Sequence, residues 1–135
     1  MNKTEVRVPI LAYHGLSKKG NRLNGVYTLG ADQFETQMAY LSEQNLKTIS
    51  LERMVKWISG ESIPPKSIGI TFDDGLESDF SIALPILKRH GFVATFFVNP
   101  GTLGTEGHLT VEELRTLHRA GMEIGSHGLP PRLSF

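Results

Sequence analysis

Apolar residues recur along this chain with two spacings, which predict short strands alternating with helices. Apolar runs bounded by polar residues, glycine or proline predict strands at residues 8–13, 47–49, 68–72, 93–98 and 122–126. Apolar residues three or four apart predict helices around residues 34–41, 51–58 and 80–90, and a fourth after residue 110. Residues 15–30 are polar with recurring glycines, so we expect a loop there. The alternation predicts an α/β fold with a parallel sheet and right-handed crossovers.

Residues near the predicted helix ends refine these boundaries. Asp32 with Glu35, and Thr110 with Glu113, have the spacing of a capping box, in which two side chains satisfy amides at a helix N-terminus. Pro85 falls inside the predicted helix at 80–90, where a proline removes a backbone hydrogen bond. We therefore expect that helix to start late, so that Pro85 lies in its first turn.

Two predicted strands end in side chains that suit hydrolytic chemistry. The strand at 68–72 leads into Asp73, Asp74 and Gly75, which we call the acidic turn, and the strand at 122–126 leads into His127. Parallel α/β folds expose catalytic groups at such strand ends. Neighbouring side chains of an extended chain point to opposite faces, so one aspartate can hold a metal while the other takes a proton. Together the two strand ends predict a metal-hydrolase site.

Composition and charge narrow the class of protein. The formal net charge is zero, from 14 basic and 14 acidic residues, which argues against nucleic acid or an anionic membrane as a partner. The chain has no cysteine, which excludes disulfides, cysteine–zinc sites and thiol nucleophiles. The first eight residues lack the apolar run of a signal peptide, and no apolar run reaches transmembrane length. With 135 residues, the chain is expected to form one domain.

The acidic turn and the histidine lie in segments that resemble a known family. Residues 71–75, followed about fifty residues later by residues 125–128, are similar to the motifs of the polysaccharide deacetylases of the NodB-homology type, carbohydrate esterase family 4. Residues 8–14, 83–98 and 109–124 resemble the family's opening strand, the segment between its motifs and the approach to its histidine. The resemblance covers essentially the whole chain.

The resemblance implies an architecture as well as an activity. The expected fold is a distorted, incomplete (β/α) barrel of the NodB deacetylase type, with parallel strands, flanking helices and the site at the strand C-termini. Residues 1–135 would form a single partial domain of this type, with a divergent tail at 129–135 that does not resemble another strand–helix unit.

The same resemblance implies a metal-dependent hydrolase that removes N- or O-acetyl groups from a polysaccharide. Asp73 would be the general base, and Asp74 and His127 would be ligands of a divalent metal of the zinc type. The family has a second histidine four residues after the first, and here that place is Pro131. A catalytic zinc normally keeps three protein ligands, so the site is expected to be one ligand short. Later family motifs, including the one that supplies the acid, have no counterpart, so we expect weak or absent catalysis.

Two alternatives follow from these departures from the family pattern, and a third follows from the strand that precedes the acidic turn. A non-catalytic, deacetylase-like carbohydrate-binding or decayed protein is favoured by Pro131. A piece of an active enzyme is favoured by the abrupt end of the match after Gly128, and an open sheet edge would then promote self-association. A nucleoside triphosphatase, suggested by the apolar strand that runs into Asp73 and Asp74, is argued against because residues 15–20 are not followed by the lysine and hydroxyl residue of a phosphate loop.

Other polar and aromatic residues carry weaker signals. His14 could lie near the pocket mouth, although we favour a structural role for it. Phe96 and Phe97 lie inside a predicted strand, so we interpret them as core residues rather than as a platform for a sugar ring. The glycan and the metal stay open, since histidine and carboxylate ligands accept several divalent ions.

Overall fold

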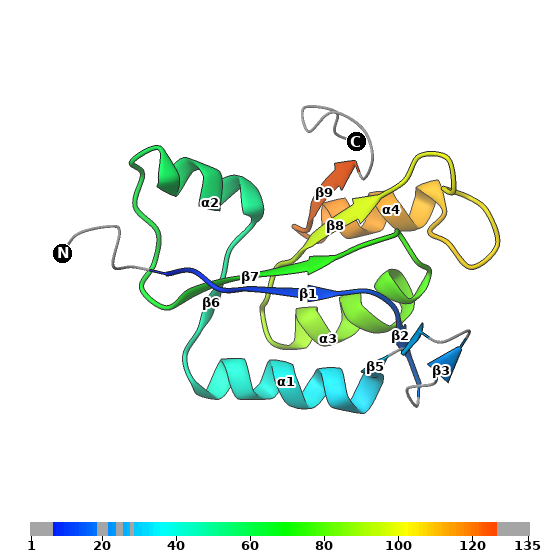
Figure 1. The fold of residues 1–135 in the computed structure, drawn as a ribbon, viewed down its shortest axis with the longest axis horizontal. Helices are drawn as coiled ribbons and strands as arrows, with labels where there is room; N and C mark the ends of the chain where they lie inside the picture. Colours follow the sequence, from blue (N-terminus) through cyan, green and yellow to red (C-terminus); the bar gives the residue numbers. More distant parts are fainter. Residues whose placement is uncertain (1–6, 19–21, 24–25, 28, 127–135) are drawn as a thin grey trace.

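Five parallel strands form the centre of the protein. The computed structural model describes residues 7–18, 22–23, 26–27 and 29–126. The sheet has the order β1–β7–β8–β9, with β6 paired to the first residues of β7 (Figure 1). The bounds are β1 (Ile10–Tyr13), β6 (Lys47–Thr48), β7 (Ser67–Phe72), β8 (Thr95–Val98) and β9 (Glu123–Ser126). All these pairings are parallel, and the sheet does not close into a barrel within the described residues.

Helices lie on both sides of this sheet. Figure 1 shows α1 and α3 on one side of the strands and α2 on the other. The bounds are α1 (Ala31–Glu43), α2 (Leu51–Ile58), the π-helical segment η2 (Asp79–Ala83), α3 (Leu84–Arg89) and α4 (Val111–Arg119). Parallel strands with intervening helices on an open sheet confirm the predicted α/β fold, in the form of an incomplete barrel. Among the described residues, no helix combines the length and apolar character that a membrane crossing requires.

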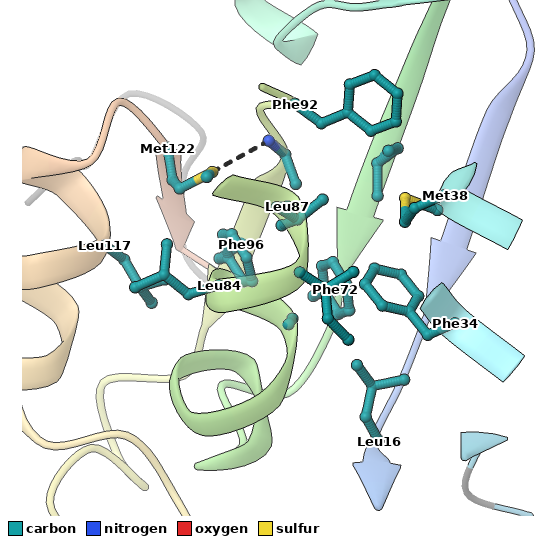
Figure 2. Close-up of a cluster of buried hydrophobic side chains, with 14 of the residues drawn as sticks. Leu16, Phe34, Met38, Phe72, Leu84, Leu87, Phe92, Phe96, Leu117 and Met122 are labelled. Carbon is teal, nitrogen blue, oxygen red and sulfur yellow. Dashed lines mark hydrogen bonds between the residues drawn. The ribbon is translucent and has the colours of Figure 1, made fainter. Parts of the chain in front are cut away.

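The hydrophobic core lies between the strands and helices α1, α3 and α4. Alternate residues of β7 face it, and Phe72 stacks on Phe96 of β8 with ring centroids 4.8 Å apart. Phe34 of α1 meets Phe72 edge-on at 5.6 Å, and both rings are fully buried. Figure 2 shows these rings with Leu84 and Leu87 of α3 in one cluster. Burial of several aromatic rings supplies much of the driving force for folding.

The opposite face of the sheet is occupied at one end by α2. Gly69 of β7 has no side chain, and a Cβ atom there would overlap the terminal methyl of Met54. Glu123 of β9 reaches the start of α2, where Oε1 accepts from the Leu51 amide at 2.9 Å and Oε2 from the Glu52 amide at 3.1 Å. The Thr95 hydroxyl donates to the same carboxylate at 2.5 Å. A carboxylate from a distant strand therefore caps α2.

Two helix boundaries agree with the sequence prediction. Thr110 Oγ1 accepts from the Glu113 amide at 3.1 Å, and the Glu113 carboxylate accepts from the Thr110 amide at 2.9 Å, which confirms the capping box of α4. Pro85 lies in the first turn of α3, as expected for a late start. The residues before it form η2, a wider helical turn.

The predicted capping box of Asp32 and Glu35 was wrong. Asp32 does not cap α1, because Gly30 occupies the cap position and its amide donates to Gln33 Oε1 at 3.0 Å. Glu35 instead pairs with Arg89 and His90 at the end of α3, at 3.2 and 3.3 Å. A contact across two helices therefore replaces the local one that the sequence favoured.

The predicted loop at 15–30 contains four two-residue strands. β2 (Leu16–Ser17) pairs in parallel with β5 (Leu29–Gly30), and β3 (Arg22–Leu23) pairs antiparallel with β4 (Val26–Tyr27). Strands this short have no periodicity to detect in the sequence.

Candidate active site

The acidic turn lies directly after β7, at the C-terminal edge of the sheet. The Asp73 amide donates to the carbonyl of Tyr13 on β1 at 3.0 Å, which continues the β1–β7 ladder by one residue. Asp73 is half-buried and Asp74 is exposed. The two carboxylates therefore differ in exposure, and both lie at the edge where parallel folds bind ligands.

Backbone conformation makes the acidic turn unusual. Asp74 has φ +77° and Gly75 has φ +58°, so two consecutive residues are left-handed. Aspartate tolerates this region better than most residues with a side chain, and such conformations cluster at functional sites. Gly75 is also pressed against β8, since a Cβ atom there would lie 3.0 Å from Cγ1 of Val98. Glycine is therefore favoured at position 75 both by its φ angle and by its surroundings.

The loop between β8 and α4, residues 99–110, holds this turn in place. The Leu109 amide donates to the Gly75 carbonyl at 2.9 Å, and the Glu77 amide donates to the Gly107 carbonyl at 3.0 Å. Leu76 and His108 form an antiparallel bridge between these two bonds. Backbone hydrogen bonds from a second loop thus fix the direction in which the two aspartates project.

Substituting Gly75→Ala is expected to destabilise the fold by about 2–4 kcal/mol, because left-handed strain and overpacking against Val98 add together. Gly91→Ala is the matched control, since Gly91 has φ +67° but no described atom within 4 Å of an added Cβ. The control isolates the strain, for which we expect about 1 kcal/mol. Urea unfolding of both variants provides the measurement, and equal losses would show that the Val98 contact carries no energy.

His14, for which the sequence left open a place near the pocket mouth or a structural role, lies beside the acidic turn. It follows β1, whose last residue Tyr13 pairs with Phe72, so its ring lies beside the acidic turn. His14 Nδ1 is 3.5 Å from Asp74 Oδ2, and the two side chains are 65% and 51% exposed. The pairing of β1 with β7 creates this neighbourhood, which the sequence alone does not show.

Asp79, the first residue of η2, is a residue that sequence reasoning overlooked. It is completely buried, and neither carboxyl oxygen has a hydrogen-bond partner among the described residues. Burial raises the pKa of Asp79 to about 8, and the charges of Asp74 and Asp73 add to the rise. The backbone amide of Leu76 offsets part of this rise in pKa, although it forms no hydrogen bond of normal geometry with either oxygen. In the sequence, Asp79 is marked only by being an acidic residue at the start of the helix that follows Asp73 and Asp74.

The predicted ligand His127, together with Pro131, lies outside the described residues. β9 ends at Ser126, which pairs with Val98 on β8. Within the described part of the chain, no group of three or more histidine, cysteine, aspartate or glutamate side chains could hold a metal ion. The roles of Asp73 as base and of Asp74 and His127 as ligands stay predictions.

A groove of about 850 Å³ opens elsewhere, between α2 and β9. The acidic turn does not line it, so it is not the candidate active site. Phe97 does line it and is half-buried, whereas its neighbour Phe96 lies in the core. The interpretation of both rings as core residues was therefore right for Phe96 and wrong for Phe97, because successive residues of a strand face opposite sides.

Comparison with known proteins places this geometry in a family. The polysaccharide deacetylase family profile matches residues 60–130, which is more than half of the chain. YxkH of Bacillus subtilis (strain 168) is 33% identical over 128 residues, covering 93% of this chain and 44% of YxkH. The poly-beta-1,6-N-acetyl-D-glucosamine N-deacetylase of Staphylococcus aureus (strain N315) is 29% identical over 107 residues, covering 75% of this chain and 37% of that protein. The chain thus spans less than half of these two relatives.

Solved structures agree with the sequence relatives. The Streptococcus pyogenes deacetylase PplD, in complex with acetate, superimposes with a TM-score of 0.79 at 26% identity, covering 90% of this chain and 56% of PplD. IcaB from Ammonifex degensii superimposes with a TM-score of 0.77 at 25% identity, covering 89% of this chain and 52% of IcaB. The profile and these relatives confirm the resemblance seen in the sequence: the chain belongs to the polysaccharide deacetylase family and has the NodB-type fold.

Proposed function

We propose that the acidic turn, His14 and His127 form part of a metal-dependent site that hydrolyses acetyl groups from a polysaccharide. The observation that carries this proposal is the placement of two aspartates of different exposure, beside an exposed histidine, at the C-terminal edge of the sheet. Membership of the polysaccharide deacetylase family supports the reaction class. The name of the Staphylococcus aureus relative supports a polymer of N-acetylglucosamine as the substrate, and O-acetylated glycans are the alternative.

The donor atoms near Asp74 fit a divalent cation of the zinc type. Zinc accepts carboxylate oxygen and imidazole nitrogen, which are the donor types of the exposed Asp74 carboxylate and of the His127 side chain. Asp74 and His127 are the proposed ligands. When bound, such an ion polarises a carbonyl group and lowers the pKa of water.

Asp73 and His14 are the proposed acid–base residues. Asp73 is half-buried, and its backbone is held by Tyr13, so its carboxylate can take a proton from water in a fixed direction. His14 is exposed at the rim, where its ring can give a proton to the leaving amine or alcohol. With this assignment, His14 takes the place of the general acid, which in the family comes from a motif that this chain lacks.

Zinc titration of the purified chain tests the ligand assignment. We expect weak binding, because Pro131 stands where the family has a histidine and a catalytic zinc usually keeps three protein ligands. Asp74→Ala and His127→Ala should abolish it, whereas Asp73→Asn should retain it. His108→Ala is the control, since His108 is also part of the bridge beside the acidic turn but is not a proposed ligand. Equal binding by Asp74→Ala would contradict the assignment.

Hydrolysis of an activated aryl acetate tests the base. Such a leaving group needs no proton, so the reaction depends on Asp73 and not on the acid. We expect zinc-dependent acetate release that falls by about 10²–10⁴-fold in Asp73→Asn. N-acetylated oligosaccharides, which need the acid as well, should be turned over far more slowly. Aryl acetate hydrolysis that is unchanged in Asp73→Asn would instead favour a binding protein without this chemistry.

A further inference from the structure

Asp79 lies behind the acidic turn and has no part in the chemistry proposed above. It is five residues beyond Asp74, at the point where the chain leaves the turn and enters η2. The side chain is fully buried, and both of its oxygens lack partners among the described residues. An ionised carboxylate in such a place is very unfavourable, so a buried aspartate without a partner has to carry a proton or gain a nearby positive charge.

Among the described residues, the two charges that act on Asp79 are both negative. Asp73 and Asp74 are the groups whose fields act on it, and both raise its pKa. The elements packed against η2 are α3, β2 and α4. Glu113 of α4 is engaged in the Thr110 capping box. The other ionisable side chains of α3 and α4 are exposed and do not contribute to its pKa: Lys88, Arg89, Glu112, Arg115, His118 and Arg119.

We propose that Asp79 is a positioning residue for the aspartate pair, uncharged while the site is empty and ionised when a divalent cation binds at the acidic turn. This inference rests on the proposed metal-dependent function. In the empty site a neutral Asp79 avoids a third negative charge beside Asp73 and Asp74. A cation reverses the sign of the field, so the O–H bond of Asp79 breaks, the electron pair stays on the carboxylate and the proton passes to solvent.

The consequence is that cation binding is linked to the release of one additional proton. Between pH 5 and 7, Asp79 is largely protonated before binding, so affinity for the cation rises more steeply with pH than the ligands alone require. One linked proton changes affinity by up to about tenfold per pH unit. Asparagine has nearly the same shape as the neutral acid and cannot release a proton.

Calorimetry with zinc, in two buffers of different ionisation enthalpy, counts the protons released. We expect wild-type chain to release more protons than Asp79→Asn at pH 7, and its affinity to gain up to about tenfold more per pH unit. Glu77→Gln is the matched control, because it removes an exposed carboxylate two residues away. It should behave as wild type. Equal proton release by wild type and Asp79→Asn would overturn the proposal.

Two further results separate this inference from the proposed function. If Asp79→Asn weakens zinc binding equally at every pH, Asp79 is a ligand and the proposal fails. If zinc binds to no variant, the proposed metal function fails, and infrared spectroscopy of the metal-free chain still tests Asp79. A band of a protonated carboxylic acid at pH 7 that is absent from Asp79→Asn and present in Glu77→Gln supports the uncharged state. Absence of that band from wild type contradicts it.

Discussion

Asp79→Asn is expected to make the protein more stable at neutral pH than the wild type, in contrast to most substitutions at a fully buried position. The folded state raises the pKa of Asp79 to about 8, from an ordinary value of 3.8, because the side chain is buried beside Asp74 and Asp73. An aspartate whose folded pKa is raised stabilises the fold below pH 3.8 and loses that contribution as the pH rises toward 8. Asparagine carries no such dependence.

The size of the effect follows from the window between the two pKa values. Each pKa unit corresponds to about 1.4 kcal/mol, so the free energy of unfolding of the wild type should fall relative to Asp79→Asn by up to about 4 kcal/mol between pH 4 and pH 7. At pH 4 the two proteins should differ little, since both side chains are uncharged. Denaturant unfolding at pH 4, 5, 6 and 7, with Glu77→Gln as the exposed control, measures the difference. A constant difference across this range would show that Asp79 does not titrate with folding.

Glu123→Ala is expected to cost about 3 kcal/mol and to release α2 from the sheet. The Glu123 carboxylate accepts from the Leu51 and Glu52 amides and from the Thr95 hydroxyl, and all three donors lose this acceptor in the variant. Hydrogen bonds to a charged acceptor each contribute about 1.5–3 kcal/mol, and a negative charge at a helix N-terminus adds to this. Water can hydrogen-bond to some of the donors that Glu123 leaves. The expected loss of stability is therefore close to the contribution of one or two hydrogen bonds.

Hydrogen exchange provides the more specific readout for Glu123. The Leu51 and Glu52 amides should exchange faster in Glu123→Ala, while the amides of β7 and α3 keep their relative protection. Glu123→Gln retains an acceptor oxygen without the charge and should lose about half as much stability. Glu61→Ala is the control, because Glu61 is an exposed glutamate just after α2. If the α2 amides are protected from exchange equally in Glu123→Ala and wild type, the packing of Met54 against Gly69 is enough to hold the helix on the sheet.

Much of the fold could be predicted from local patterns. The main strands and helices appear where apolar spacing places them, and the Thr110–Glu113 capping box and the position of Pro85 follow from residues close in sequence. The strand boundaries differ by at most two residues because strand ends depend on the neighbouring strand, whereas α1 starts three residues earlier and α3 four residues later than the apolar spacing places them. The cap of α1 was wrong because Glu35 bonds to α3, a partner that no local pattern contains.

The candidate site was predictable only in part. Asp73 and Asp74 stand out because they follow a long apolar strand, and the structure places both at the sheet edge. His14 lies beside them because β1 pairs with β7 and not with the next strand in the chain, and such non-sequential pairing cannot be read from one sequence. Asp79 and Glu123 were missed for a related reason: a single buried carboxyl group has no periodic signature, and its role depends on charges and amides far away in the chain.

The attachment of the β8–α4 loop to the acidic turn bears on how this protein can be redesigned. Surface loops usually accept inserted residues, because their length is not tied to the rest of the fold. Residues 104–109 are an exception, since their backbone is bonded to Gly75 and Glu77, and an inserted residue there would shift the register of both bonds. The loop at 61–66, between α2 and β7, has no such tie to the aspartates. A new binding segment grafted at 61–66 would leave the two carboxylates in place, whereas one grafted at 104–109 would turn them away from their present direction.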